Sequence, residues 1–243
     1  KKLDCLDLPE QIFLTEHVQM SSEQEAAYYD METELLAEVA SGECAATNAL
    51  ARCTRLLQIL SGYLPVEHES GVQATHRFKS VPRLNRLKEL LTELVDEHKV
   101  IVWCQYKENY KDIKAICEEL GAESAELTGE TTDRQDEIDR FNLDPKCRVM
   151  VANPKAGGVG VNLIASDYAI YFNRSYSLLD REQSLARNFR KGSEIHDKVT
   201  IVDLVCKGTI DEAVLFALSE KKSFSDVVLE KLRLRYQNAS ASK

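Results

Sequence analysis

The chain has 243 residues and a net charge of −9, with 44% hydrophobic, 29% charged and 7% aromatic side chains, a composition that is typical of globular proteins and excludes the disordered, collagen-like and membrane-spanning classes. No stretch approaches the roughly 20 consecutive apolar residues of a transmembrane helix, the first residues do not lead into a signal-peptide core, and the seven cysteines include no C-x-x-C pair. We therefore expect an intracellular, soluble chain, in the cytoplasm or the nucleus, with reduced thiols and no membrane partner.

The first 75 residues are expected to form a strand followed by a helical segment. Apolar spacing and turn residues predict a strand over 9–19, helices over 22–40 and 47–61, and a loop over 62–76. Residues 1–75 carry 13 acidic and four basic side chains, so most of the negative charge of the chain lies here.

Residues 76–220 are expected to form a doubly wound α/β domain. Short apolar runs, rich in β-branched residues and without polar alternation, predict strands that are buried on both faces of a parallel sheet. The runs are 100–103, 149–152, 168–172 and 199–205. Helical patterns alternate with them, as apolar stripes over Leu84–Val95 and Ile113–Leu120 and as helices over 131–141 and 178–191. This alternation implies crossover connections with helices on both faces of the sheet.

Helix 131–141 is expected to start at Thr131 or Thr132, since either hydroxyl can cap it. A last helix over 209–236 is expected to lead into a polar, frayed tail. The predicted division of the chain is 1–75 for the N-terminal segment, 76–220 for the α/β domain and 221–243 for the C-terminal extension.

The loop after 149–152 is the first candidate site, because ligands of an open parallel sheet bind at the carboxyl ends of its strands. Residues 153–163 include Gly157, Gly158 and Gly160, whose bare amides can approach phosphate oxygens. The loop lacks the G-K-[ST] of a Walker A motif, and a tight turn without a ligand is the alternative interpretation. Residues 146–207 carry ten basic and six acidic side chains, a local excess that suits a polyanion despite the overall negative charge.

Helix 178–191 holds the second candidate site. Arg187 and Arg190 lie three residues apart, so one helical face can direct both guanidinium groups to the same place. Planar, permanently charged guanidinium groups suit phosphoryl oxygens, above all where charge develops during γ-phosphate transfer. The alternative interpretation is a solvated helix face.

The order of these elements resembles motifs V and VI of superfamily 2 helicases, and most strongly those of Swi/Snf-type ATPases. That family has approximately S-T-R-A-G-G-x-G-x-N-L in the loop and Q-A-x-G-R-x-H-R-x-G-Q in the helix, which correspond to Asn153–Leu163 and Gln183–Ser193 here. Pro154 replaces the family's Thr and Phe189 its His, while both arginines are kept. Further similar landmarks are Leu8-Pro9, Ser21–Tyr28, Arg52–Gln58, Ser80 with Leu84, and Leu127-Thr128-Gly129 with Arg134 and Phe141.

The resemblance implies a three-layer RecA-like fold, similar to that of P-loop NTPases, which acts as the second motor lobe of an ATP-dependent DNA translocase or helicase. It implies that Arg187 and Arg190 are arginine fingers and that Gly160, Asn162 and Gln183 lie beside the nucleotide. The implied DNA contacts are Lys155, Gly157, Gly158, Gln105, Tyr106 and Gly129. The implied partners are the N-terminal RecA-like lobe of the same parent chain and DNA, duplex rather than RNA, with ATP and Mg²⁺ bound in the two-lobe protein and no metal ligand in this chain.

The sequence contains no Walker A motif. The run Asp136-Glu137-Ile138-Asp139 is not a D-E-x-H box either, because Ile138 and Phe141 give it the pattern of an amphipathic helix. The phosphate cradle and Mg²⁺ ligands are therefore expected on another lobe, and the isolated chain is expected to hydrolyse no ATP. Two alternatives remain open, a non-enzymatic interaction module built on a RecA-like lobe and the C-terminal lobe of a restriction-type or DEAD-box helicase.

Overall fold

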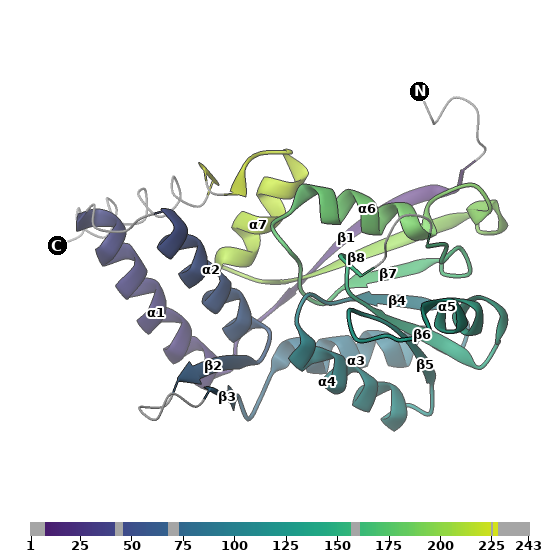
Figure 1. Ribbon diagram of the computed structural model, residues 1–243, viewed down its shortest axis with the longest axis horizontal. Helices are drawn as coiled ribbons and strands as arrows, with labels where there is room; N and C mark the ends of the chain where they lie inside the picture. Colours follow the sequence, from purple (N-terminus) through teal and green to yellow (C-terminus); the bar gives the residue numbers. More distant parts are fainter. Residues whose placement is uncertain (1–7, 42–45, 68–72, 157–160, 225, 228–243) are drawn as a thin grey trace. The chain divides into compact units, whose positions relative to one another are not determined.

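The computed structural model describes residues 8–41, 46–67, 73–156, 161–224 and 226–227 (Figure 1). The chain divides into two compact units. Unit 1 comprises Lys1–Glu16 and Leu84–Leu204, and unit 2 comprises His17–Arg83 and Val205–Lys243. Both units are therefore discontinuous in sequence, and the three-part division at residues 75 and 220 stays a prediction.

A six-stranded sheet has the strand order β1-β8-β7-β4-β6-β5. Its strands are β1 (Glu10–Val18), β4 (Val100–Trp103), β5 (Glu123–Leu127), β6 (Cys147–Ala152), β7 (Tyr168–Tyr171) and β8 (Lys198–Cys206). The central strand β4 runs parallel to both of its neighbours, with Val100 opposite Val149 of β6 and Tyr168 of β7. The four apolar runs and the strand near the N-terminus are thus confirmed as strands.

Alternation along β4 explains why the sheet is covered on both faces. Val100 and Val102 enter one hydrophobic core, while Ile101 and Trp103 enter the other. Helices α3 (Pro82–Leu94) and α4 (Lys107–Glu119) pack on the first core, and α5 (Arg134–Leu143) and α6 (Leu178–Asn188) contribute to the second (Figure 1). The predicted three-layer α/β fold class is confirmed.

The helix ends are set by local backbone conformation and by capping hydrogen bonds. At the end of α4, Gly121 has a φ of 67° and the amide of Ala122 donates to the carbonyl of Cys117, as in a Schellman cap. The expected cap of α5 at Thr131 or Thr132 was wrong, because the side chain of Asp133 accepts from the amide of Asp136 instead. Ser177 caps α6 by accepting from the amide of Asp180.

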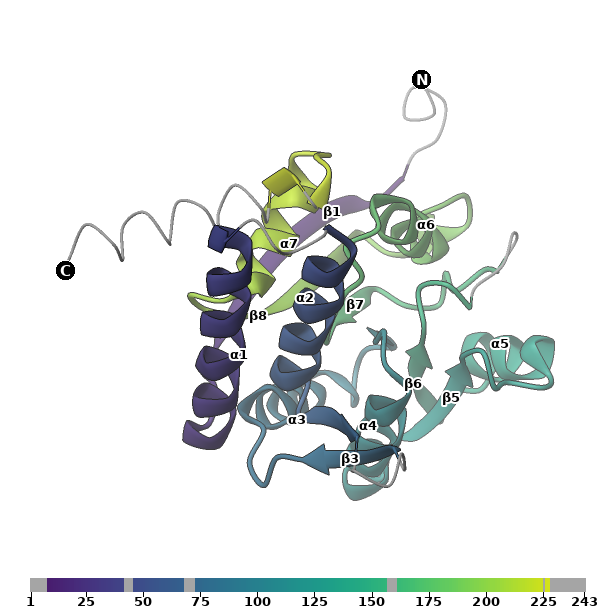
Figure 2. The same ribbon diagram turned by 60° about the vertical axis from the view of Figure 1, so that its left-hand side comes forward.

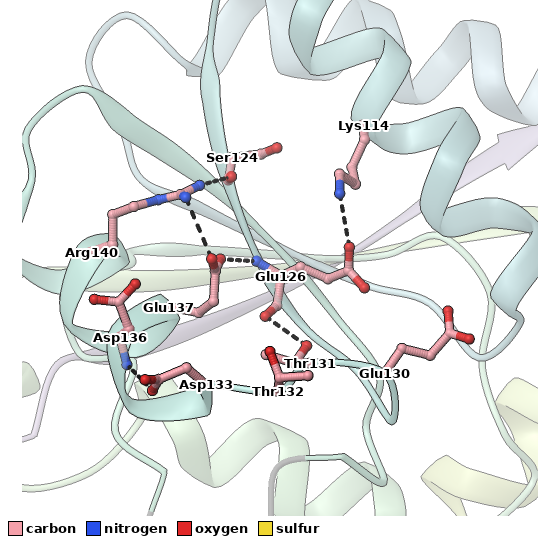
Figure 3. Close-up of a pocket in the computed structure, with 10 residues that line it drawn as sticks. All are labelled: Lys114, Ser124, Glu126, Glu130, Thr131, Thr132, Asp133, Asp136, Glu137 and Arg140. Carbon is pink, nitrogen blue, oxygen red and sulfur yellow. Dashed lines mark hydrogen bonds and ion pairs between the residues drawn. The ribbon is translucent and has the colours of Figure 1, made fainter.

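Edge strand β5 was not predicted as a strand, since its sequence ESAEL offers no apolar run. Its outer backbone groups are bonded to side chains rather than to another strand (Figure 3). The amide of Glu126 donates to Glu137 Oε2 at 2.6 Å, and Thr131 Oγ1 donates to the carbonyl of Glu126 at 3.0 Å. Arg140 donates to the carbonyl of Ser124, and the amide of Thr128 donates to Thr131 Oγ1 at 2.9 Å. Side chains of α5 and of the turn before it therefore occupy the place that a seventh strand would take.

Unit 2 contains α1 (Ser22–Ser41), α2 (Ala46–Leu60), an antiparallel hairpin of β2 (Tyr63–Glu67) and β3 (Gln73–Arg77), and α7 (Ile210–Ser219). Helices α1 and α2 run side by side in both views (Figure 1 and Figure 2). The buried hydroxyl of Tyr28 accepts from the amide of Ile210 at 2.8 Å and so links α1 to α7.

Two predictions for unit 2 were wrong. The expected loop over 62–76 contains the hairpin, in which Pro65 pairs with Thr75; a proline signals a break locally, but the two-stranded sheet accommodates it at an edge. The helix expected over 209–236 ends at Ser219, where Lys221 takes a positive φ of 53° and the amide of Lys222 donates to the carbonyl of Ala217. The rest of that expected helix falls mostly outside the described residues.

Within the described part of the chain, none of the helices combines the length and apolar character needed to cross a bilayer. The described cysteines 53, 104, 117, 147 and 206 are buried free thiols. Burial raises the pKa of Cys117 to about 12, so this thiol stays protonated and serves as a small apolar side chain.

Candidate functional site

The carboxyl ends of β4, β6 and β7 are joined by side-chain amides. Gln105, two residues beyond the end of β4, donates its backbone amide to Asn173 Oδ1 at 2.6 Å. Its carbonyl accepts from Asn153 Nδ2 at 3.0 Å. Asn153 follows β6 and Asn173 follows β7, so the three polar residues hold neighbouring strand ends in register.

Helix α4 is attached to this edge. Asn153 Nδ2 also donates to the Tyr110 hydroxyl at 2.7 Å, and Asn173 Nδ2 donates to Asn109 Oδ1 at 2.9 Å. Burial raises the pKa of Tyr110 to about 12, so its phenol remains neutral. Tyr106 occupies the N-cap position of α4 in extended conformation. The predicted DNA contacts Gln105 and Tyr106 therefore sit on a rigid edge.

Lys155 lies close to the same edge, three residues beyond β6. Its backbone amide donates to Asn153 Oδ1 at 2.8 Å, and its ammonium group is 3.9 Å from Asp180 Oδ2 on α6. The side chain is 60% exposed, so this ion pair contributes little stability and leaves Lys155 accessible. Gly129 is exposed in the turn after β5. The predicted contacts Gly157, Gly158 and Gly160 lie outside the described residues.

Helix α6 ends at Asn188 and not at 191 as expected, so Arg187 lies in its last turn and Arg190 follows it by two residues. The backbone of Arg187 and the side chain of Arg190 both contact the segment that follows the glycine-rich loop. Arg190 Nη1 donates to the carbonyl of Val161 at 3.2 Å, and the carbonyl of Arg187 accepts from the amide of Leu163 at 3.0 Å. Burial, and after it the charge of Arg190, lower the pKa of Arg187. The guanidinium groups therefore lie near enough to repel each other, and a bound anion would relieve this repulsion.

Asn162 lies between the two contact points of the arginines. Its carbonyl accepts from Asn142 Nδ2 at 2.8 Å, which fixes the segment to α5. Gln183 is exposed on α6, one turn before Arg187. The structure thus brings Arg187 and Arg190 to the backbone on either side of Asn162, with Gln183 on the same helix as Arg187.

Sequence reasoning missed a group of charged side chains at the other end of α6. Arg181 Nη1 and Nη2 lie 2.9 and 2.7 Å from the two carboxylate oxygens of Asp203 in β8. Arg174 Nε is 3.3 Å from the same carboxylate. The sequence did contain a signal of this group. Asp203 interrupts the apolar run 199–205, which was predicted to be a buried strand, and a buried carboxylate needs a cationic or hydrogen-bonding partner.

A polar pocket of about 400 Å³ lies along β5 and α5 (Figure 3). Five carboxylates but only two cationic side chains, Lys114 and Arg140, line it. This excess of negative charge is unsuited to a nucleotide or a nucleic acid. Among the described residues, no group of three or more histidine, cysteine, aspartate or glutamate side chains could hold a metal ion.

Comparison with known proteins gives a consistent result. Residues 82–192 match the helicase conserved C-terminal domain. The CHD3-type chromatin-remodeling factor PICKLE of Arabidopsis thaliana is 24% identical over 248 residues, which cover 98% of this chain and 18% of that relative. This chain therefore spans about a fifth of the length of that relative.

Two solved structures share the fold. The C-terminal part of the Fun30 ATPase domain superposes with a TM-score of 0.73 at 17% identity, covering 96% of this chain and 99% of the other. The Sulfolobus solfataricus SWI2/SNF2 ATPase core in complex with dsDNA gives a TM-score of 0.69 at 24% identity, covering 95% of this chain and 48% of the other.

Proposed function

The chain contains a helicase conserved C-terminal domain and is homologous to Swi/Snf-type ATPases, and from this premise we propose that it is the second, RecA-like motor lobe of an ATP-dependent DNA translocase. It works with an N-terminal RecA-like lobe of the same protein. We expect that protein to be located in the compartment that holds the DNA. This is the nucleus, or the cytoplasm in a cell that has no nucleus.

The convergence of Arg187 and Arg190 carries this proposal. The Arg190 guanidinium contacts the backbone of Val161, the Arg187 main chain contacts that of Leu163, and the charge of Arg190 lowers the pKa of Arg187. A pair of fixed positive charges at one place stabilises the negative charge that develops on a transferred γ-phosphoryl group. A non-enzymatic interaction module has no need for two like charges held this close.

Among the described residues, Arg187 and Arg190 suit the phosphates of ATP, whereas no group of side chains suits Mg²⁺. Arg187 and Arg190 would act as arginine fingers, while Gly160, Asn162 and Gln183 would lie beside the nucleotide. Mg²⁺ neutralises phosphate charge when it is bound, and its ligands and the Walker A cradle would come from the N-terminal lobe.

The DNA would lie along the carboxyl edge of the sheet. Lys155, Gln105, Tyr106 and Gly129 follow β6, β4 and β5 there, and the proposed contacts Gly157 and Gly158 come soon after Lys155 in the sequence. Lysine, amide and backbone N–H groups bind phosphate oxygens without reading the bases, as a tracking motor requires. The relative that was solved with dsDNA supports a duplex as the substrate.

The arginine-finger role is tested by Arg190→Ala and Arg190→Lys in the intact protein that carries this chain. Removing an arginine finger costs on the order of 10³-fold or more in kcat. We expect DNA-stimulated ATP hydrolysis to fall by about that factor, with lysine restoring little because it lacks the planar fork. Steady-state kinetics at saturating DNA measure the effect.

Lys191→Ala is the matched control, since Lys191 is the exposed neighbour of Arg190. Its kcat is expected to remain near that of the unmodified protein. The isolated chain is expected to turn over no ATP. An Arg190→Ala protein that keeps its turnover, or ATPase activity of the isolated chain that depends on Arg190, would refute the proposal.

A further inference from the structure

We infer that Arg181, Asp203 and Tyr171 form a clamp that sets the position of helix α6 and, through it, of the two proposed arginine fingers. The clamp touches neither nucleotide nor DNA in this proposal. Its three members come from α6, β8 and β7, and all belong to unit 1. The catalytic consequence rests on the proposed function, whereas the placement of α6 does not.

Asp203 is the residue of the sheet to which α6 is bonded through Arg181. Its side chain is 5% exposed, and every residue of β8 after the first is buried. A carboxylate in such surroundings loses its hydration and is retained only with close, well-oriented cationic partners.

Arg181 provides such a partner from the first half of α6. Its two terminal nitrogens meet the two Asp203 oxygens at 2.9 and 2.7 Å, a bidentate arrangement that fixes angle as well as distance. The guanidinium carbon also lies 3.6 Å from the centre of the Tyr171 ring. The guanidinium plane is thus held by two contacts that lysine could not reproduce.

Tyr171 fixes α6 a second time, one turn further on. Its hydroxyl is 2.7 Å from Ser184 Oγ, and both residues are buried. Burial raises the pKa of Tyr171 to about 12, so the phenol keeps its proton and this hydrogen bond. Helix α6 is therefore attached at residues three apart on one face.

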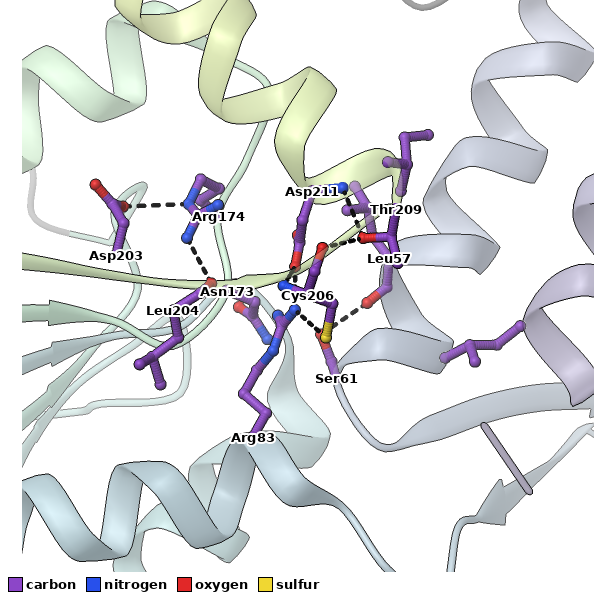
Figure 4. A network of polar contacts seen from close by, with 12 residues as sticks. Leu57, Ser61, Arg83, Asn173, Arg174, Asp203, Leu204, Cys206, Thr209 and Asp211 are labelled. Carbon is purple, nitrogen blue, oxygen red and sulfur yellow. Dashed lines mark hydrogen bonds and ion pairs between the residues drawn. The ribbon is translucent and has the colours of Figure 1, made fainter. Parts of the chain in front are cut away.

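Arg174 is a second cationic partner of the Asp203 carboxylate. Its Nε is 3.3 Å from Asp203 Oδ1, and its Nη2 donates to the carbonyl of Leu204 at 2.7 Å (Figure 4). The Asp203 carboxylate is thereby paired with two arginines.

The clamp acts on the fingers through the length of the helix. Arg187 lies six residues beyond Arg181, about 9 Å along the axis at 1.5 Å per residue. A small tilt of the first half of α6 therefore displaces the guanidinium group of Arg187, and with it that of Arg190, which follows the last helical residue Asn188 by two positions. Misplacing a catalytic group by about 1 Å costs about 10²-fold in rate, while binding of the nucleotide can persist.

The test uses Arg181→Ala, Arg181→Lys and Tyr171→Phe in the intact protein. We expect Arg181→Ala to lower kcat of the DNA-stimulated ATPase by about 10- to 100-fold with KM for ATP within about twofold. Arg181→Lys, which keeps the charge but loses the fork, is expected to recover little. Tyr171→Phe, which removes only the bond to Ser184, is expected to show a smaller loss.

Hydrogen exchange of the same proteins separates this proposal from the proposed function. Arg181→Ala should speed exchange of the α6 amides while the amides of β4 and β6 stay protected. Arg134 is an exposed arginine of α5, and Arg134→Ala should change neither kcat nor the exchange of α6.

If Arg190→Ala is inactive but the Arg181 variants keep both kcat and α6 protection, the clamp is wrong and the motor proposal stands. If α6 loosens while Arg190→Ala stays active, the clamp positions the helix and the finger role is wrong. If Arg181→Ala fails to fold, kcat and α6 hydrogen exchange of Arg181→Lys decide between these outcomes.

Discussion

Arg83 is a buried arginine whose charge is balanced inside unit 2 (Figure 4). It forms an ion pair with Asp211, and both side chains are 1% exposed. Burial by itself lowers the pKa of Arg83, but the carboxylate of Asp211 and the hydrogen bond to Cys206 Sγ outweigh that effect and raise it above its ordinary value. The arginine is therefore charged at every pH at which the protein is folded, and it needs its carboxylate.

Asp211→Ala is expected to lower the free energy of unfolding by about 3–5 kcal/mol, because it leaves a buried charge without its partner. Chemical denaturation monitored by circular dichroism measures this. The double variant Arg83→Met, Asp211→Leu should recover much of the loss, since a buried pair can often be replaced by apolar residues. Asp226→Asn, at an exposed position, is the control. A loss below about 1 kcal/mol for Asp211→Ala would contradict the assignment.

At the level of elements, the outer edge of β5 is closed by side chains. Glu137, Arg140 and Thr131 bond the backbone of Ser124, Glu126 and Thr128 where a further strand would bond. An edge strand with free backbone groups is a template for pairing with another chain, and native proteins block such edges. We assign this protective role to the three side chains.

The triple variant Thr131→Val, Glu137→Ala, Arg140→Ala should therefore self-associate, because it frees the edge of β5. Sedimentation velocity over a range of protein concentrations detects this. The matched control Thr132→Val, Asp136→Ala, Arg134→Ala changes the same kinds of residue at exposed positions of the same segment and should stay unchanged. Equal association of both variants would show that lost surface charge, not the opened edge, is the cause.

Across the whole molecule, charge is unevenly distributed. The net charge is −9, although residues 146–207 carry ten basic and six acidic side chains. The negative remainder would repel DNA at long range, so we expect the proposed DNA binding to depend on short-range phosphate contacts at the carboxyl edge of the sheet. One lobe would supply few of these contacts, so we expect its binding to be weak and sensitive to salt.

We expect the affinity of the chain for duplex DNA to fall between about 50 and about 200 mM salt, and Lys155→Ala to reduce the slope of log K against log salt by about one. Fluorescence anisotropy with a labelled duplex measures both. Lys146→Ala is the control, since this exposed lysine precedes β6 whereas Lys155 follows it. An unchanged slope with Lys155→Ala removes this residue from the DNA site.

The sequence by itself determined the parallel α/β fold and the order of its main elements. Runs such as 100–103 show their strand character without reference to any other residue, because a strand buried on both faces must be apolar throughout. The helices on both faces follow from the same local patterns. The motifs around Gly157 and Arg187 likewise lie within short stretches, so the helicase resemblance could be recognised without coordinates.

Only the tertiary structure decided which polar groups meet. Asp133 rather than Thr131 caps α5 because Thr131 is engaged by β5, a strand with no apolar run to announce it. The contact of Arg190 with Val161 and that of Arg181 with Asp203 join residues more than 20 positions apart. A hydrogen bond depends on both partners and on the path of the chain between them, so neither partner's local sequence contains it.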